Sequence, residues 1–467
     1  MSTKQLRILH TNDLHSSLDN WPSVVSWLIR TREEALQNGE DVLLFDIGDH
    51  ADRVHPMTEG LLGKGNTSLL NQLHYDAVTI GNNEGMTFSK AELNSLYDHA
   101  NFPILLANLF HESGERPQWA EPYRIITTKS GIKVGVTGVT APFYTFYKTL
   151  GWNIADPQET LTPIVSMLRP EVDILICLSH LGLFEDEKLA EAFNDFDFIL
   201  GAHTHHVLPE GKKIGNTWIN QSGRSGKYTG NIKMSIDTTT DADLLELSNI
   251  EVRSEKIDTN MPDASTEHLL KELTEEALIK LNEEVTVLNE KMEVDWHKET
   301  PIIRLLCQGL KEWCKGEISM LCAGVLLEDL EAGPITLKDL HKICPHPINP
   351  ATVMISGERL LEIIRQAQKK DMIEYELKGF GFRGKILGAM VFDGVVIDHE
   401  RPSTYIQDKD ILINGESLSK DRLYKLATLD MFTFGHLYPA LSSIKEKQYY
   451  MPEFLRDILA WKLKGNY

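Results

Sequence analysis

The chain has 467 residues, which is more than one hydrophobic core usually serves, so we expect two domains. Its hydrophobic content of 42% and charged content of 25% are ordinary for a soluble globular protein. The formal net charge of −21 argues against a nucleic-acid polymer or an anionic membrane as the main partner, because both require surfaces rich in lysine and arginine.

Five apolar, strand-like segments in the first half of the chain each run into residues of the types that bind metals. In chain order they are Leu6–Leu9 with Asp13-x-His15, Val42–Phe45 with Gly48-Asp49, Ala77–Ile80 with Gly81-Asn82, Ile174–Leu178 with Ser179-His180, and Phe198–Leu200 with Gly201-x-His203-x-His205. Near-continuous apolar runs are typical of strands buried on both faces, and ligands of open α/β sheets bind beyond the carboxyl ends of such strands. We therefore expect all five groups to converge on one rim of a sheet.

The segments between and after these strands predict an α/β domain over residues 1–260, followed by a linker helix and a second domain. The helices expected in the first domain are Val24–Gln37, Thr67–Leu73 and Lys90–His99, and the further strands are Ile132–Val139 and Trp218–Gln221. Ser265-Thr266-Glu267 is expected to cap a helix Glu267–Glu284 within a linker at 261–290, after the polar stretch Asp237–Asp243.

The second domain, residues 291–467, is predicted to be mixed α+β. The expected helices are Pro301–Lys315, Thr336–Ile343 and Gly357–Lys369, and the expected strands are Glu317–Ala323, Ile386–Phe392, Val395–Ile397 and Ile411–Ile413.

The cysteines and the chain start indicate a reducing compartment. The five cysteines are odd in number and contain no CxxC pair, so we expect buried reduced thiols: Cys177, Cys307, Cys314, Cys322 and Cys344. Met1–Gln5 runs directly into the first strand, and the chain contains no apolar run of about 18 residues. We expect a cytoplasmic protein that does not bind membranes.

Seven residues at the strand ends can be divided between two metal ions if Asp49 is shared. One ion would take Asp13, His15, Asp49 and His205, and the other Asp49, Asn82, His180 and His203. Mixed nitrogen and oxygen donors suit Mn, Zn, Fe or Co better than Ca or Mg alone. Two such ions about 3.5–4 Å apart are the apparatus for in-line attack on phosphorus. Each short motif alone is more often a loop or a cap, but five in this order favour a metal site.

This series of motifs resembles the calcineurin-like metallophosphoesterases. The opening Ile8–His15 is similar to that of the 5′-nucleotidase / 2′,3′-cyclic-nucleotide phosphodiesterase branch, in its cytoplasmic bacterial group. In the second half, Pro345–Asn349, Val353–Leu360, Ile413–Gly415 and Tyr424–Thr428 resemble the C-terminal nucleotide-binding domain of that branch. The resemblance implies a metallophosphoesterase β-sandwich flanked by helices, a second mixed α+β domain, and the ligand division given above.

The chain departs from the resembled family beside the expected metals. Asn83 occupies the position of the family's catalytic histidine, and Met86 that of its aspartate partner. An amide cannot deliver a proton near pH 7, which costs on the order of 10²–10⁴-fold for poor leaving groups. We therefore assign no catalytic residue and expect a diester or an anhydride as substrate rather than a 5′-monoester. His206 or His50 could supply the proton instead.

The second domain departs as well. The family's nucleotide-holding loop corresponds to Cys322–Leu327, where Leu327 replaces the arginine. The turn after the family's stacking phenylalanine corresponds to Phe434–Tyr438. That phenylalanine aligns with Met431, or with Phe432 or Phe434 after a shift in register, so Met431 and Phe432 are the predicted substrate contacts. Either this domain binds a different ligand or it has become a structural lid.

The sequence thus predicts a binuclear metal-dependent phosphoester hydrolase acting on a nucleotide-like or other small phosphorylated metabolite. The missing acid and arginine also allow an alternative from another class, a metal-binding pseudoenzyme that acts as a ligand sensor or a scaffold.

Overall fold

The computed structural model describes residues 3–238, 245–379, 381–397 and 406–465, and the chain divides into two compact units, Met1–Ala277 and Leu278–Tyr467. Helix α9 (Ala264–Leu281) crosses this division. It begins three residues before the predicted start, because Asp263 rather than the Ser265 group acts as the cap. Asp263 Oδ1 accepts a hydrogen bond from the Thr266 backbone N–H at 2.8 Å.

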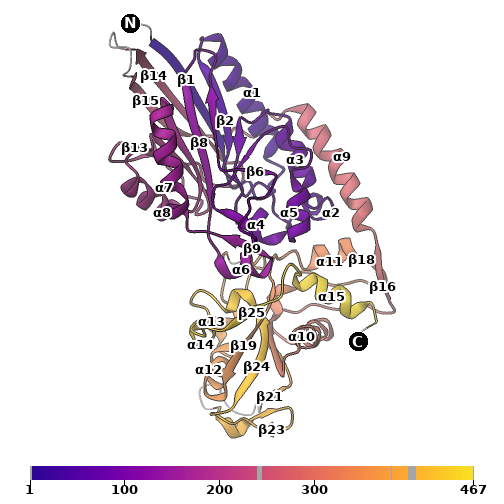
Figure 1. The fold of residues 1–467 in the computed structure, drawn as a ribbon. Helices are drawn as coiled ribbons and strands as arrows, with labels where there is room; N and C mark the ends of the chain where they lie inside the picture. The colour runs from indigo at the N-terminus through magenta and orange to yellow at the C-terminus, as the bar shows by residue number, and fades with distance from the viewer. Residues whose placement is uncertain (1–2, 239–244, 380, 398–405, 466–467) are drawn as a thin grey trace. The chain divides into compact units, whose positions relative to one another are not determined.

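Unit 1 is built on two mixed β-sheets that face each other (Figure 1). The first sheet has the order β15-β14-β1-β2-β3-β4-β6, with β1 Thr3–Thr11, β2 Asp41–Asp46, β3 Ala77–Val78, β4 Ile104–Leu105, β6 Ala120–Glu121, β14 Tyr228–Thr238 and β15 Leu245–Lys256. The second has the order β12-β13-β11-β10-β8-β7, with β7 Tyr123–Thr127, β8 Lys133–Thr140, β10 Ile174–His180, β11 Phe198–Gly201, β12 Lys212–Ile214 and β13 Thr217–Gln221. This arrangement confirms the predicted sandwich.

Helices cover both outer faces of the sandwich. Helices α1 (Trp21–Gln37), α3 (Lys64–Asn71) and α5 (Lys90–Leu96) lie on the side of the first sheet, and α7 (Pro157–Leu168) and α8 (Leu183–Ala192) on the side of the second (Figure 1). Strand β10 shows why its sequence is apolar throughout. Ile176 and Leu178 face the core between the sheets, whereas Leu175 and Cys177 face the core under α7 and α8.

The five strand-end groups do not share one rim of a single sheet, as the strand pattern alone predicted. β1, β2 and β3 belong to the first sheet, and β10 and β11 belong to the second. The groups can meet because the parallel strands of both sheets end on the same side of the sandwich. In addition, Ser179 and His180 are the last two residues of β10 rather than part of the following loop.

The hairpin of β14 and β15 was not predicted from the sequence. β14 pairs antiparallel with β1, while β1 pairs parallel with β2, so the hairpin extends the first sheet beyond its N-terminal strand. Its residues alternate between apolar and polar, which gives no continuous apolar run. Of the predicted polar stretch Asp237–Asp243, residues 239–243 lie outside the described residues.

Unit 2 is mixed α+β, as predicted. Its five-stranded sheet has the order β20-β17-β24-β19-β25, with β17 Ile318–Cys322, β19 Pro350–Ser356, β20 Met390–Asp393, β24 Leu423–Leu429 and β25 Lys447–Tyr449. The helices packed on it include α10 Pro301–Trp313, α11 Leu337–Ile343, α12 Gly357–Ala367 and α15 Leu455–Leu463. Two small sheets complete the unit, β16 Glu284–Leu288 with β18 Gly333–Thr336, and β21 Val395–Ile397 with β22 Ile411–Ile413 and β23 Glu416–Ser417.

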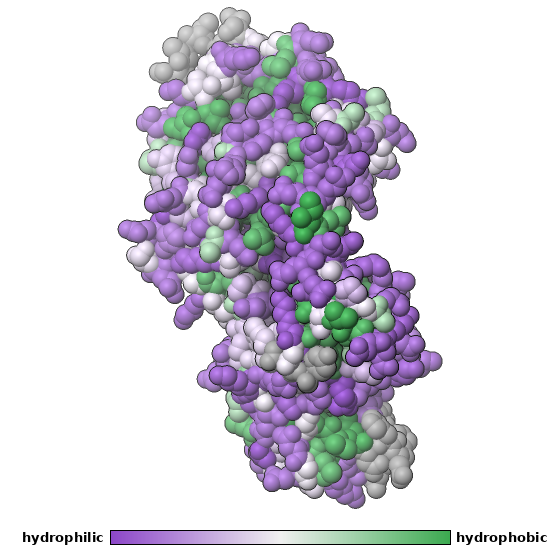
Figure 2. Space-filling model, turned by 90° about the vertical axis from the view of Figure 1, so that its right-hand side faces the viewer, coloured by the Kyte–Doolittle hydropathy of each residue, from purple (hydrophilic) through white to green (hydrophobic). Residues whose placement is uncertain are grey.

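The strand predicted at Ile386–Phe392 begins four residues later than expected, at Met390, because Gly388 has a φ of +75° that a strand cannot accommodate. All five cysteines are free and buried. Among the described residues, no helix is both long enough and apolar enough to span a membrane. The face shown in Figure 2 is mostly hydrophilic, with its apolar residues in separate patches.

Candidate metal centre

Five of the predicted ligands present their donor atoms to one another at the strand ends of unit 1. Asp13, His15 and His205 form one group of mutually close donor atoms, and Asp13, Asp49 and His180 form another, with all atoms in each group within 4.8 Å. Asp49 Oδ2 also lies 3.5 Å from His15 Nε2 and 3.4 Å from His180 Nε2. Both aspartates therefore stand between the two groups of imidazoles.

His15 is held by a carboxylate on the side of its ring away from the other donors. Its Nε2 lies 2.9 Å from His205 Nε2 and 3.7 Å from Asp13 Oδ1, while its Nδ1 lies 3.4 Å from Asp52 Oδ2. A carboxylate on one imidazole nitrogen fixes the ring orientation and raises the basicity of the other nitrogen. The position of Asp52 thus orients His15 Nε2 toward Asp13 and Asp49.

His180 is oriented by a backbone carbonyl. Its Nδ1 lies 2.7 Å from the Ile47 carbonyl oxygen, to which it can only donate, so the neutral ring carries its lone pair on Nε2. This Nε2 is buried and has no hydrogen-bond partner among the described residues. A buried acceptor costs free energy when it lacks a partner, so this atom is suited to a bound cation.

Asn82 and His203 complete the set of seven. Asn82 begins α4 (Asn82–Thr87), and its Oδ1 is a second buried acceptor to which no residue that the structure describes donates. The His203 ring lies 5.3 Å from the His180 ring, and its backbone N–H lies 3.1 Å from both carboxylate oxygens of Asp13. The structure therefore places His203 against His180 and Asp13, and it places Asn82 directly after Gly81, which lies against Asp49 and His180.

The loops that carry the seven residues have unusual backbone geometry. Five of the seven have positive φ values between 48° and 71°: Asp13, His15, Asp49, His203 and His205. Side chains other than glycine rarely adopt this conformation, and it is concentrated at functional sites. Gly81 must remain a glycine for another reason, since an added Cβ would stand 2.5 Å from His180 Cε1 and 2.6 Å from Asp49 Cγ.

The charges of the site favour protonated imidazoles when no cation is present. Burial alone would lower the pKa of His15, but hydrogen bonds to Asp13 and Asp52 and the charge of Asp49 raise it to about 10. The same competition, dominated on the raising side by Asp49, brings the pKa of His180 to about 9. The aspartates thus concentrate negative charge that a divalent cation could neutralise in place of these protons. The donor types, the two partnerless acceptors and this charge fit divalent metals.

Asn83 faces the shared aspartate. Its side-chain amide donates to Asp49 Oδ2 at 2.7 Å, and its backbone N–H donates to Asp49 Oδ1 at 2.8 Å. Its Nδ2 also lies 3.3 Å from His15 Nδ1. The amide therefore holds a predicted ligand rather than offering a proton to a substrate.

The two other histidines considered as proton donors have different settings. His50 is buried against Trp21, with ring centroids 4.7 Å apart, and burial lowers its pKa to about 3. It is a core residue. His206 is exposed and places its Nδ1 2.9 Å from Thr204 Oγ1, next to the His203-x-His205 pair.

Sequence reasoning missed three buried acids that support the site. The Glu84 carboxylate accepts hydrogen bonds from the backbone N–H groups of Asp49, Ala51 and Gly81, so it joins two of the ligand loops. Asp52 orients His15. Asp186 accepts hydrogen bonds from Ser179 Oγ at 2.5 Å and Gln221 Nε2 at 2.7 Å, behind β10 and β11.

A signal for two of these acids was present in the sequence, since Asp52 and Glu84 each lie within three residues of a predicted ligand. Asp186 had no such signal, because its partners come from separate strands.

The predicted substrate contacts of the second domain are buried in this structure. Met431 and Phe432 have no exposed surface and belong to the hydrophobic core of unit 2, where Phe432 packs edge-to-face on Tyr438. In the loop Cys322–Leu327, residues 322–326 are also buried, and Leu327 is half-buried. In this structure Met431 and Phe432 therefore stabilise the fold and present no face to a substrate.

Comparison with known proteins agrees with this geometry. Residues 6–207 match the Calcineurin-like phosphoesterase family, and residues 282–442 match the 5′-nucleotidase, C-terminal domain family. The uncharacterized metallophosphoesterase YunD of Bacillus subtilis is 42% identical over 461 residues, which cover 98% of this chain and 99% of that protein. The trifunctional nucleotide phosphoesterase YfkN of the same organism is 25% identical over 413 residues, or 77% of this chain and 27% of that protein.

Solved structures share the fold over its whole length. The putative 5′-nucleotidase of Staphylococcus aureus, solved in complex with alpha-ketoglutarate, superposes with a TM-score of 0.67 at 17% identity, covering 99% of this chain and 97% of that one. The full-length similarity and the two successive domain matches establish the family. The chain belongs to the calcineurin-like metallophosphoesterases that carry a 5′-nucleotidase C-terminal domain, a family of hydrolases that act on phosphoester bonds.

Proposed function

We propose that this protein is a binuclear metal-dependent hydrolase of a small phosphorylated metabolite, nucleotide-like in character, with a diester or an anhydride preferred over a 5′-monoester. The observation that carries the proposal is the convergence of five donor residues, Asp13, His15, Asp49, His180 and His205, with the buried Oδ1 of Asn82 and Nε2 of His180 left without hydrogen-bond partners among the described residues. Buried polar atoms without partners are rare and call for an explanation, and cation binding supplies one here.

Two divalent ions of the Mn, Zn, Fe or Co type would be held by these residues. We assign Asp13, His15, Asp49 and His205 to one ion and Asp49, Asn82, His180 and His203 to the other. When bound, such ions supply positive charge to phosphoryl oxygens and activate water for attack on phosphorus. The protein's own contribution is orientation, because Asp52, Glu84 and the Ile47 carbonyl hold the ligand side chains and loops.

The preferred substrate class follows from residue 83. An asparagine amide cannot donate a proton to a leaving alkoxide, and the hydrogen bond from Asn83 to Asp49 keeps this amide on the ligand. Phosphate and aryloxide groups leave without such help, whereas a ribose 5′-alkoxide does not. The net charge of −21 supports a small substrate rather than a nucleic-acid polymer or a membrane. The five free thiols support a cytoplasmic location.

The test is hydrolysis by the full-length, Mn²⁺-loaded protein. We expect turnover of bis-4-nitrophenyl phosphate and of inorganic pyrophosphate, slower turnover of AMP, and loss of all three activities in Asp49→Ala. Metal content measured on the same samples separates the alternatives. A loaded protein that hydrolyses none of the three substrates would support the pseudoenzyme, and equal rates on AMP and the activated substrates would contradict the argument from Asn83.

A further inference from the structure

An exposed aromatic ring stands beside one of the predicted metal ligands. Phe143 is 36% exposed, and its ring lies 5.9 Å from the His203 ring in an edge-to-face arrangement. Single exposed aromatic residues are common on protein surfaces, so exposure by itself carries no function. Three further observations concern how this ring is held and what surrounds it.

The backbone fixes Phe143 in a tight turn. Its φ of −73° and ψ of 70° are those of the central residue of an inverse γ-turn, and the Tyr144 N–H donates to the Pro142 carbonyl at 2.8 Å across it. The turn fixes the φ and ψ angles of Phe143, and so it fixes the direction in which the side chain leaves the backbone. The Phe146 ring, in the helix that follows the turn, lies edge-to-face against Phe143 with ring centroids 6.4 Å apart.

The helix that follows the turn is anchored to the helix that carries Asn82. Phe143 precedes α6 (Tyr144–Thr149), which lies beside α4 in Figure 1. The fully buried Tyr147 of α6 reaches α4 at Gly85, where an added Cβ would stand 2.8 Å from Tyr147 Cζ. Gly85 therefore makes room for Tyr147. This contact fixes Phe143 relative to the first turn of α4, where Asn82 and Asn83 lie.

The two substrate contacts predicted in unit 2 are not exposed in this structure, and the alternative, Phe434, is half-buried. Met431 and Phe432 are fully buried, so neither offers a free face for a ring of the substrate. Phe143 and its neighbour Tyr144, which is 53% exposed, offer such faces in unit 1, next to His203.

We propose that Phe143 contacts the organic group of the substrate, and that this group contains an aromatic ring such as an aryl group or a nucleobase. This inference rests on the proposed function, because the aromatic group that contacts Phe143 belongs to a phosphorus compound held near His203. Aromatic rings attract one another in stacked or edge-to-face arrangements, and a stacked base contributes enough for its loss to weaken binding roughly fivefold to a hundredfold.

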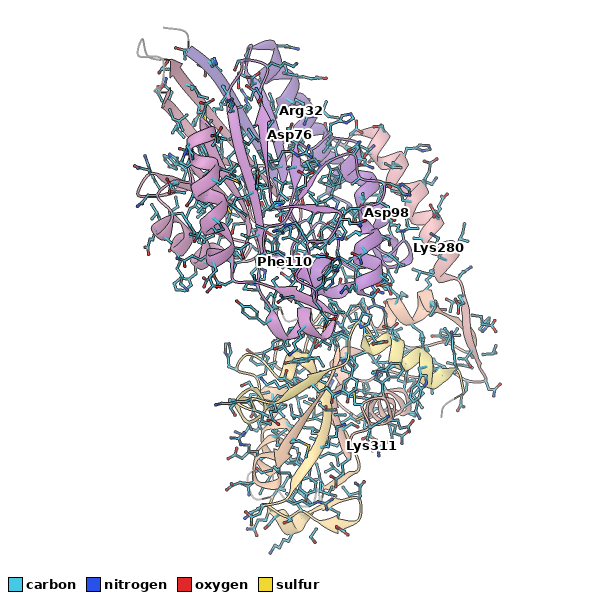
Figure 3. The ribbon with its side chains drawn as sticks, viewed as in Figure 1. Arg32, Asp76, Asp98, Phe110, Lys280 and Lys311 are labelled. Atoms are coloured by element: carbon cyan, nitrogen blue, oxygen red, sulfur yellow. The ribbon has the colours of Figure 1, made fainter. Side chains whose placement is uncertain are left out.

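Binding of stable phosphonates to the Mn²⁺-loaded, full-length protein tests the proposal without requiring turnover. By calorimetry, the wild type should bind phenylphosphonate at least about fivefold more tightly than methylphosphonate. Phe143→Ala should remove this preference while leaving the Kd of methylphosphonate unchanged, and Phe143→Trp should restore it. The matched control is Phe110→Ala in the same unit, since the Phe110 ring (Figure 3) lies 4.8 Å from the Arg116 guanidinium instead of a predicted ligand. This control should keep the preference.

Kinetics provide a second readout. Phe143→Ala should raise KM for bis-4-nitrophenyl phosphate by about fivefold or more relative to KM for inorganic pyrophosphate, which has no organic group, with little change in kcat. Equal weakening of both phosphonates, or no change in either, would overturn the role of Phe143, as would a wild type that binds neither. Absence of hydrolysis with an intact phenyl preference would instead refute the proposed function and leave this inference standing.

Discussion

Gly81→Ala is the most direct perturbation of the candidate metal centre, because the atoms nearest to the added methyl group belong to two predicted ligands, Asp49 and His180. Gly81 has a φ of −95°, which alanine adopts without strain, so any effect comes from contact rather than from the backbone. The new Cβ would stand 2.5 Å from His180 Cε1 and 2.6 Å from Asp49 Cγ, whereas ordinary contact begins at 3.4 Å.

The magnitude follows from these distances. His180 Cε1 must move by about 0.9 Å, and Asp49 must move further because its Oδ1 lies closest to the new Cβ, whereas metal–ligand distances tolerate only about 0.2 Å. A misplacement of about 1 Å at a reacting site costs roughly 10²-fold in rate. We therefore expect Gly81→Ala to lose at least one equivalent of bound metal and to fall by about 10²-fold or more in kcat/KM for bis-4-nitrophenyl phosphate.

The assay is metal analysis after gel filtration, followed by hydrolysis in added Mn²⁺. Gly135→Ala is the matched control. It places a methyl group in the core of the same unit, 3.0 Å from Leu175 Cδ1, which can shift, and it should keep both metal and activity. Full metal content and full activity in Gly81→Ala would refute the assignment of Asp49 and His180 as ligands.

Three further outcomes are expected. Asn83→His should raise the rate on AMP relative to that on bis-4-nitrophenyl phosphate by up to about 10²-fold, because an imidazole can protonate the leaving oxygen. An unchanged ratio of the two rates would show that residue 83 does not set the substrate preference. Burial raises the pKa of Asp186 from 3.8 to about 7, so the stability that its protonated form contributes is complete below pH 4 and lost as the pH rises through 7. In urea unfolding, the wild type should lose about 2 kcal/mol relative to Asp186→Asn between pH 5 and pH 7.5, and parallel profiles would contradict this. Chelation should abolish hydrolysis and lower Tm, and Mn²⁺ should restore both, whereas a Tm indifferent to the metal would argue against binding to the folded state.

Several features of this protein could be read from the sequence because they depend on neighbours in the chain. An apolar run followed within four residues by Asp13 or Asp49 predicts both the strand and the donor residue that comes after its end. Helix α10 and helix α12 begin at the residues predicted for them, since Pro301 and the Ser356 cap are local signals.

The tertiary structure alone decided features that depend on packing between distant segments. The strand-end groups come from two sheets. The sequence could not predict this, because an apolar strand does not indicate which sheet it will join. Met431 and Phe432 resemble a binding segment in sequence, yet the core of unit 2 buries them completely.

The predicted metal ligands could be found in the sequence, whereas the contacts that position them could not. The sequence by itself determined which residue types stand at the ends of the buried strands, since that order is a property of the chain. Only the folded structure decided that Asn83 turns to Asp49, that Glu84 ties two loops together and that Tyr147 fits against Gly85, because each of these contacts joins segments more than 30 residues apart or depends on side-chain direction.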